Sequence, residues 1–239
     1  VYSLDQAKKL SAAAVSMGVD VKIHIKLETG MDRLGFKVND NELDDAYSAC
    51  TLPQLVPEGI FTHFAVADDG VDGEEFTRSQ FNKFKTGVDY LESKGVRFAL
   101  RHCCNTAGIF DYPEFHMDMV RAGIGQYGYP PSGKCATDVG LVPAMNFKSV
   151  ISHIKEINPG DTVGYGRTFT ADRKIKVATV PVGYADGLFR ANSNGRFAFC
   201  INGKPAPILG RVCMDQTMVD VSDIDCAPGD EVTSFGNKE

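Results

Sequence analysis

Apolar residues recur with two alternating periods along the first 120 positions. In residues 3–18 they are three and four positions apart, behind an S-x-x-Q capping box at Ser3 and Gln6, so we predict an amphipathic helix. The β-branched run at 21–27 predicts a strand. The alternation continues with helices expected at 40–50, 72–94 and from 106, and strands at 59–64, 96–101 and 119–124. Strands that alternate with helices indicate βα units and a parallel sheet.

The pattern changes near residue 141. From residue 147 onward apolar residues alternate with period two between turn-forming residues, and no helix is indicated. Two strands at 196–201 and 206–209 flank Asn202-Gly203, the signal of a type I′ hairpin. Further strands are expected at 150–157, 176–182, 212–221 and 231–235. We therefore predict an α/β unit over residues 1–141 and a mostly-β domain over residues 142–239.

Side chains capable of chemistry follow the expected parallel strands at their carboxyl ends. They are Lys26, Arg33, His63, His102, Asn105 and Arg121. A (β/α)8 barrel collects its active site at this face, and such a barrel has eight strands, whereas four are indicated here. We therefore expect the C-terminal half of a TIM-type barrel. Glycines 123 and 125 next to Arg121 would let backbone N–H groups approach an anion, so the set favours a phosphate-bearing ligand.

Each of these residues also has a purely structural explanation. A histidine at the end of a strand is often a buried structural residue, Arg121 could pair with Asp118, and glycines 123 and 125 could serve packing. His63 and His102 lack the spaced third ligand that a zinc site requires, so no metal is expected. The functional interpretation depends on four successive strand ends that all carry such groups.

Charge and composition exclude several classes of protein. The chain has 239 residues, with 25 Lys plus Arg against 31 Asp plus Glu and a net charge of −6. A nucleic-acid binder would show a basic excess, so no nucleic-acid partner is expected. No apolar run is long enough for a membrane-spanning helix, and residues 1–10 do not resemble a signal peptide. Seven cysteines without CxxC spacing suggest reduced thiols in the cytoplasm.

Six segments, taken in order, resemble motifs of the alanine racemases. The first, KLETGMDRLGF at 26–36, resembles K-x-D-T-G-M-x-R-L-G, with Glu28 in place of the aspartate. The others are GIFTHFAVAD at 59–68, HCCNTA at 102–107, VRAGIGQYG at 120–128, VGYADG at 182–187 and GRVCMDQ at 210–216. The resemblance covers nearly the whole chain. It implies a homodimeric racemase dependent on pyridoxal 5′-phosphate, whose active sites combine one subunit's barrel with the other's β domain.

The resemblance also implies a cofactor site. Arg121 would donate to the pyridine nitrogen, which arginine cannot protonate, so the ring is a weaker electron sink. His102 would be the partner of Arg121. The phosphate would lie against Asn105 and Thr106 and the backbone of Gly123 and Ile124.

The same resemblance assigns the proton-transfer and substrate residues. Tyr184 would be one of two bases on opposite faces of the substrate, with His63 as its partner, and its pKa must fall for it to act near neutral pH. Arg33 and the backbone N–H of Met214 would hold the substrate carboxylate. Lys26 matches a lysine that is carbamylated in many members, and the alternative is a lysine in an ordinary salt bridge.

One motif of the family does not occur. The lysine that forms the Schiff base lies in a K-A-N-A-Y-G-H-G type segment, and this sequence contains no such segment. We therefore expect a fragment that lacks the N-terminal half-barrel and the extreme C-terminus and is inactive alone. The parent protein would racemise L-alanine to D-alanine for peptidoglycan synthesis. A serine/alanine racemase and a non-catalytic truncated homologue remain alternatives, whereas the β-domain motifs argue against another phosphate-binding barrel enzyme.

Overall fold

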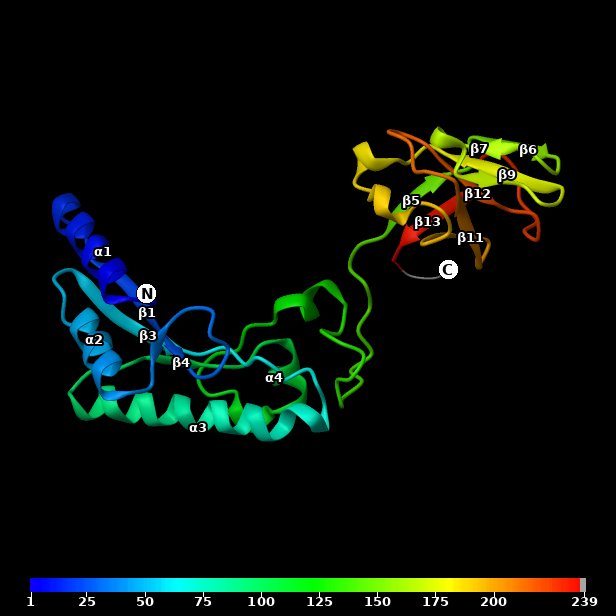
Figure 1. The fold of residues 1–239 in the computed structure, drawn as a ribbon. Coiled ribbons are helices and arrows are strands. Elements are labelled where there is room, and N and C mark those ends of the chain that lie inside the picture. Colours follow the sequence, from blue (N-terminus) through cyan, green and yellow to red (C-terminus); the bar gives the residue numbers. More distant parts are fainter. Residues whose placement is uncertain (237–239) are drawn as a thin grey trace. The chain divides into compact units, whose positions relative to one another are not determined.

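The structure is a computed structural model that describes residues 1–236. The chain divides into two compact units, Val1–Leu141 and Val142–Glu239 (Figure 1). Each unit has its own hydrophobic core. In the described part of the chain, no helix has both the length and the apolar character needed to cross a membrane. All seven cysteines are free thiols.

The first unit is built on a parallel sheet of four strands in the order β2-β1-β3-β4. The strands are β1 (Val21–Glu28), β2 (Phe36–Lys37), β3 (Leu55–Phe61) and β4 (Leu100–His102). The helices are α1 (Leu4–Met17), α2 (Asp40–Cys50), α3 (Val71–Ser93) and α4 (Thr106–Asp111), with the 3-10 helices η1 (Pro113–Phe115) and η2 (Gly123–Tyr127). The βα alternation predicted for this unit is therefore present.

Strand β1 divides its side chains between two faces because successive residues of a strand point in opposite directions. Ile23, Ile25 and Leu27 are buried in the core that includes Leu43 of α2 and Phe84 of α3. The intervening positions of the strand carry His24, Lys26 and Glu28. The helix-covered face is thus apolar, and the opposite face of the sheet presents the polar groups of the candidate site.

The expected strand at 119–124 is wrong. Gly123 has φ 52°, a left-handed conformation that does not continue a strand, and it begins the 3-10 helix η2. The residues before Gly123 nevertheless lie beside the segment that follows β4, because the N–H of Arg121 donates to Cys104 O at 3.1 Å.

The cap of α1 is close to the prediction. Ser3 Oγ accepts from the N–H of Gln6 at 3.2 Å, while Gln6 Oε1 accepts from Tyr2 rather than from Ser3.

The second unit contains a seven-stranded antiparallel sheet in the order β5-β13-β10-β11-β12-β9-β6 and a separate two-stranded ribbon, β7-β8. The strands are β5 (Phe147–Val150), β6 (His153–Ile157), β7 (Thr162–Val163), β8 (Phe169–Thr170), β9 (Ile175–Val180), β10 (Ala198–Ile201), β11 (Lys204–Leu209), β12 (Thr217–Asp220) and β13 (Glu231–Phe235). The 3-10 helices are η3 (Tyr165–Arg167), η4 (Tyr184–Asp186) and η5 (Arg190–Asn192). This unit is mostly β, as the alternation predicted.

The predicted type I′ turn joins β10 to β11. Asn202 and Gly203 both have positive φ, 47° and 74°, as this turn requires.

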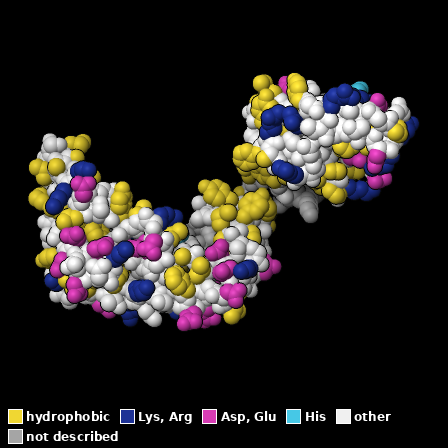
Figure 2. Space-filling model, in the orientation of Figure 1, with side chains coloured by type: hydrophobic (Ala, Val, Ile, Leu, Met, Phe, Trp, Pro, Cys, Tyr) yellow, Lys and Arg dark blue, Asp and Glu magenta, His cyan; other side chains and the backbone are white. Residues whose placement is uncertain are grey.

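On the surface, acidic and basic side chains are interspersed over the visible face of the first unit, without a single basic patch (Figure 2). This distribution agrees with the absence of a basic excess in the sequence.

Candidate functional site

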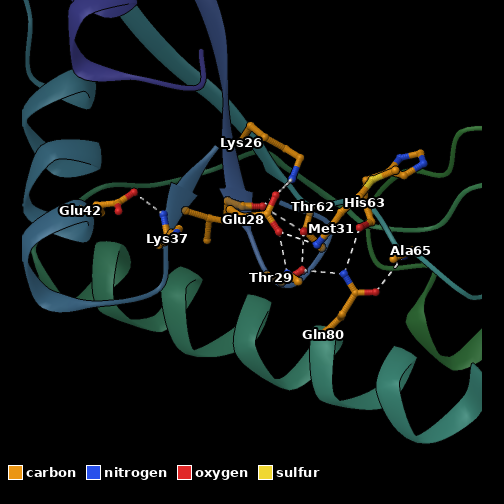
Figure 3. A network of polar contacts seen from close by, with 12 residues as sticks. Lys26, Glu28, Thr29, Met31, Lys37, Glu42, Thr62, His63, Ala65 and Gln80 are labelled. Atoms are coloured by element: carbon orange, nitrogen blue, oxygen red, sulfur yellow. Dashed lines mark hydrogen bonds and ion pairs between the residues drawn. The ribbon is translucent and has the colours of Figure 1, made fainter. Parts of the chain in front are cut away.

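Lys26 lies on the polar face of β1, and only 3% of its surface is exposed. Its Nζ donates to Leu27 O at 2.6 Å and lies 3.9 Å from Glu28 Oε2 (Figure 3). Burial lowers the pKa of Lys26 to about 8; Glu28 opposes this shift, and the positive charges of Arg33 and Arg121 add to it. The site therefore contains an amine that is partly neutral at mildly alkaline pH.

Glu28 fixes the turn that follows β1. Its Oε1 accepts hydrogen bonds from the N–H groups of Gly30 and Met31, each at 2.6 Å. Burial opposes ionisation, but these N–H groups, that of Asp32 and the charge of Lys26 hold the pKa of Glu28 below its ordinary value. Within residues 1–236, Glu28 Oε2 has no hydrogen-bond partner. Arg33, whose side chain is exposed, thus follows a turn that is anchored to a buried carboxylate.

Arg121 is held by backbone carbonyls at the ends of two neighbouring strands. Its Nη2 donates to Thr62 O at 2.8 Å and to Cys103 O at 3.2 Å. The guanidinium also lies 5.4 Å from the centre of the Phe61 ring, a cation–π contact. Its alternative partner, Asp118, instead pairs with Arg101 at 3.2 Å. The structure therefore orients Arg121 by neutral acceptors and leaves its charge without a carboxylate partner in the described contacts.

Two neutral histidines complete the surroundings of Arg121. His102 Nδ1 contacts Arg121 Nη1, and His63 Nδ1 lies 3.3 Å from Arg121 Nη2. Burial, and then the charge of Arg121, lower the pKa of both histidines to about 4. Arginine has donors only, so His102 Nδ1 must be the acceptor. The structure thus brings together the expected residues Lys26, His63, His102 and Arg121.

The residues expected at a phosphate form a second cluster beside α4. Asn105 caps this helix through Oδ1, which accepts from the N–H of Gly108 at 3.0 Å. The Thr106 hydroxyl contacts Ala122 O and accepts from the N–H of Gly125 at 3.0 Å. A Cβ on Gly123 would lie 3.1 Å from Thr106 Oγ1. Thr106 therefore ties α4 to the glycine-rich segment that also carries Ile124.

Tyr184 and Met214 come together in the second unit. The N–H of Tyr184 donates to Cys213 O at 3.0 Å, and the N–H of Ala185 donates to Met214 O at 2.8 Å. A Cβ on Gly183 would lie 2.3 Å from Met214 O, so only glycine permits this approach. The Tyr184 side chain is 44% exposed and that of Met214 is 58% exposed. The expected pairing of Tyr184 with His63 stays a prediction.

Sequence reasoning missed Gln80, a fully buried side chain of α3. Its Nε2 donates to Thr29 Oγ1 and to His63 O, each at 3.2 Å, and its Oε1 accepts from the N–H of Ala65 at 2.9 Å (Figure 3). A signal existed, because Gln80 occupies a position of the apolar stripe that also contains Phe84. A glutamine in such a stripe must find polar partners inside the protein.

The donor set fits a pyridine ring that bears a phosphate. Arginine carries five N–H donors, and the described contacts of Arg121 use only its Nη1 and Nη2 atoms, which leaves Nε–H for a ligand acceptor. An unprotonated ring nitrogen is such an acceptor. Near Thr106, the lack of a Cβ at Gly123 keeps the backbone open to an anion.

Comparisons with known proteins identify a family for the chain. The family model described as "Alanine racemase, N-terminal domain" matches residues 1–131, and "Alanine racemase, C-terminal domain" matches residues 144–239. Alanine racemases of Desulfovibrio desulfuricans and Clostridium novyi are 40% and 43% identical over the whole chain. The chain spans 64% and 62% of their respective lengths.

Solved structures give the same result. The alanine racemase of Clostridium difficile 630 has a TM-score of 0.92 and 42% identity over the whole chain, which covers 62% of that protein. An alanine racemase from Bacillus anthracis with bound L-Ala-P has a TM-score of 0.88 and 30% identity over the whole chain, which covers 61% of it. The predicted fold class, a partial barrel followed by a β domain, is confirmed.

Proposed function

The chain belongs to the alanine racemase family, and we propose that the protein that carries it interconverts L-alanine and D-alanine with pyridoxal 5′-phosphate. The observation that carries the proposal is the setting of Arg121, a half-buried cation held by Thr62 O, Cys103 O and neutral His102. These contacts orient a donor-only group toward a ligand acceptor without neutralising its charge.

The bound cofactor would withdraw electrons from the substrate Cα and so make its proton removable. Arg121 donates to the ring nitrogen and cannot transfer a proton to it, because its pKa is far above neutral. Asn105, Thr106 and the backbone of Gly123 and Ile124 bind the phosphate. These residues form the cofactor side of the proposed site.

Proton transfer requires a base on each face of the substrate Cα. Tyr184 removes or returns the proton on one face, and a lysine outside these 239 residues acts on the other. His63, neutral because burial and Arg121 lower its pKa, accepts from the Tyr184 hydroxyl. Arg33 and the Met214 N–H hold the substrate carboxylate, with carbamylated Lys26 orienting Arg33.

The proposed assembly is a cytoplasmic homodimer in which one subunit's β domain supplies Tyr184 to the other's barrel. The exposed side chains of Tyr184 and Met214 support this arrangement, since a base shared between subunits must reach beyond its own domain. The seven free thiols agree with a reducing compartment. D-Alanine made there would supply peptidoglycan synthesis.

The test is chiral chromatography of alanine and serine incubated with pyridoxal phosphate and the protein encoded by the complete reading frame around these residues. We expect racemisation of alanine by that protein and none by the 239-residue chain alone, which lacks the lysine motif. Faster turnover of serine would instead identify a serine/alanine racemase. Cofactor binding without racemisation would identify a non-catalytic homologue.

A further inference from the structure

His24 reaches His102 across an intervening strand. The two residues belong to β1 and β4, and β3 lies between these strands in the sheet. Nevertheless His24 Nδ1 lies 2.8 Å from His102 Nε2, and the ring centres are 5.1 Å apart. The contact is therefore a direct hydrogen bond between side chains of non-adjacent strands.

Gly59 of β3 makes this crossing possible. In the register of the sheet Gly59 is paired with His24 on one side and with Leu100 on the other. A Cβ at Gly59 would lie 2.5 Å from both Nδ1 and Cε1 of the His24 ring. The backbone φ of Gly59 is not in the left-handed region, so the glycine is required here by space rather than by conformation.

The hydrogen bonds have a single consistent direction. Arg121 can only donate, so His102 Nδ1 accepts and the proton of neutral His102 lies on Nε2. That proton is donated to His24 Nδ1, which must be unprotonated. The remaining His24 proton lies on Nε2, 3.6 Å from Glu58 Oε2. Glu58 is also paired with Lys22 at 2.5 Å.

We propose that His24 is a positioning residue for Arg121, acting through His102 across the gap at Gly59. His102 is further fixed by the Phe61 ring, which is stacked on it with centres 5.0 Å apart. Because both ring nitrogens of His102 take part in hydrogen bonds, the ring has one tautomer and one orientation. In that orientation the lone pair of Nδ1 points to the guanidinium of Arg121. The effect on cofactor binding rests on the proposed function, whereas the hydrogen bond itself does not.

The first test is nuclear magnetic resonance of the purified protein with 15N-labelled histidine and arginine. We expect a scalar coupling between His102 Nε2 and His24 Nδ1, with the proton attached to His102. Absence of the coupling, or a proton attached to His24 Nδ1, overturns the proposal. This measurement needs no variant and no cofactor.

The second test uses variants. In His24→Ala the guanidinium 15N signals of Arg121 should shift, although the two residues do not touch. In His24→Asn they should return toward the wild type, because asparagine Oδ1 replaces the acceptor at Nδ1. His153→Ala, at an exposed position of β6, is the matched control and should change nothing. Unchanged Arg121 signals in a folded His24→Ala protein contradict the proposal.

A double-mutant cycle tests the role of Gly59. Gly59→Ala should move the Arg121 signals as His24→Ala does, and it should add nothing in the His24→Ala background, where no ring occupies the gap.

With cofactor bound, we expect His24→Ala to lower kcat/KM about fivefold, the effect of one net hydrogen bond. If the protein does not bind pyridoxal phosphate but shows the coupling, the proposed function fails and the positioning role stands. If the 15N signals of Arg121 shift in His24→Ala but kcat/KM is unchanged, the expected effect of His24 on activity is overturned, whereas its role in positioning Arg121 stands.

Discussion

Gln80 Nε2 lies 3.2 Å from Thr29 Oγ1, a contact that joins the middle of α3 to the turn after β1. The same side chain binds His63 O and the N–H of Ala65, which follow β3. A single buried glutamine therefore fixes the ends of two strands, one of which leads to Arg33 and the other to His63. The site depends on a residue that would not touch the substrate.

Gln80→Leu should destabilise the first unit by about 3 kcal/mol, because it leaves the buried partners of the glutamine without hydrogen bonds. The N–H of Ala65 should then exchange with deuterium faster than in the wild type. Asn82→Leu, the same kind of change at an exposed position of α3, is the control and should alter stability by less than about 0.5 kcal/mol. Equal hydrogen exchange at Ala65 in wild type and Gln80→Leu would show that Gln80 has no such role.

Arg121→Lys should weaken the binding of pyridoxal phosphate about 100-fold. An ammonium group cannot make the forked contacts with Thr62 O, Cys103 O and His102, and two hydrogen bonds to a charged group are lost. Fluorescence titration with the cofactor measures the change. Arg101→Lys, which alters an arginine paired with Glu92 and Asp118, is the matched control and should bind the cofactor as the wild type does.

Much of the fold could be predicted from the sequence because its periodicities are strong. The helix at Asp40–Cys50 and the Asn202-Gly203 turn are found where apolar spacing and turn chemistry place them. The prediction of a strand at 119–124 is wrong because Gly123 adopts a left-handed conformation. The spacing of apolar residues does not reveal which residues have positive φ. The short strand β2 was missed because two residues carry no periodic signal.

The candidate site was only partly predictable. Motifs pointed to Arg121 and His102, and one of them begins with Gly59, but they did not show the role of Gly59, which depends on a ring from a neighbouring strand. His24 stands two positions before Lys26 and hence on the same face of β1, which was a usable signal. Contacts between strands that are not adjacent cannot be derived from local pattern.

Tyr184→Phe should lower kcat/KM for racemisation by about 10²–10⁴-fold, the usual contribution of a positioned acid–base group. Cofactor binding should persist, because the expected cofactor contacts lie in the first unit. The exchange of the substrate Cα proton with deuterated solvent should fall for one enantiomer more than for the other. Tyr165→Phe, at an exposed tyrosine of the same unit, is the control. Equal loss for both enantiomers with loss of cofactor would indicate a structural role instead.

Acidification should destabilise the first unit between pH 6.5 and about 4. The pKa of His63 and His102 is lowered to about 4 in the folded chain, so the unfolded chain binds more protons within this window. Stability therefore rises with pH across the window and is lost as the pH falls through it. Urea unfolding followed by signals of this unit measures the slope. In His102→Asn, unfolding should take up about one proton fewer.

Lys26 should form a carbamate more readily than an ordinary lysine. Its neutral amine attacks carbon dioxide, the C–N bond forms, and one proton is released to solvent. With the pKa near 8, at constant dissolved carbon dioxide the modified fraction should rise as the pH passes through about 8. The 13C signal of labelled carbamate measures it, and Lys26→Arg should abolish that signal.

Glu28→Gln sharpens this test. Glu28 raises the pKa of Lys26, and its Oε2 lies 3.9 Å from Nζ, where it would repel a carbamate anion. The uncharged amide should therefore increase the modified fraction at every pH. Lys22, exposed and with its pKa raised by Glu58, should stay unmodified under the same conditions. A carbamate signal that survives Lys26→Arg, or one that decreases in Glu28→Gln, would assign Lys26 to an ordinary salt bridge with Glu28.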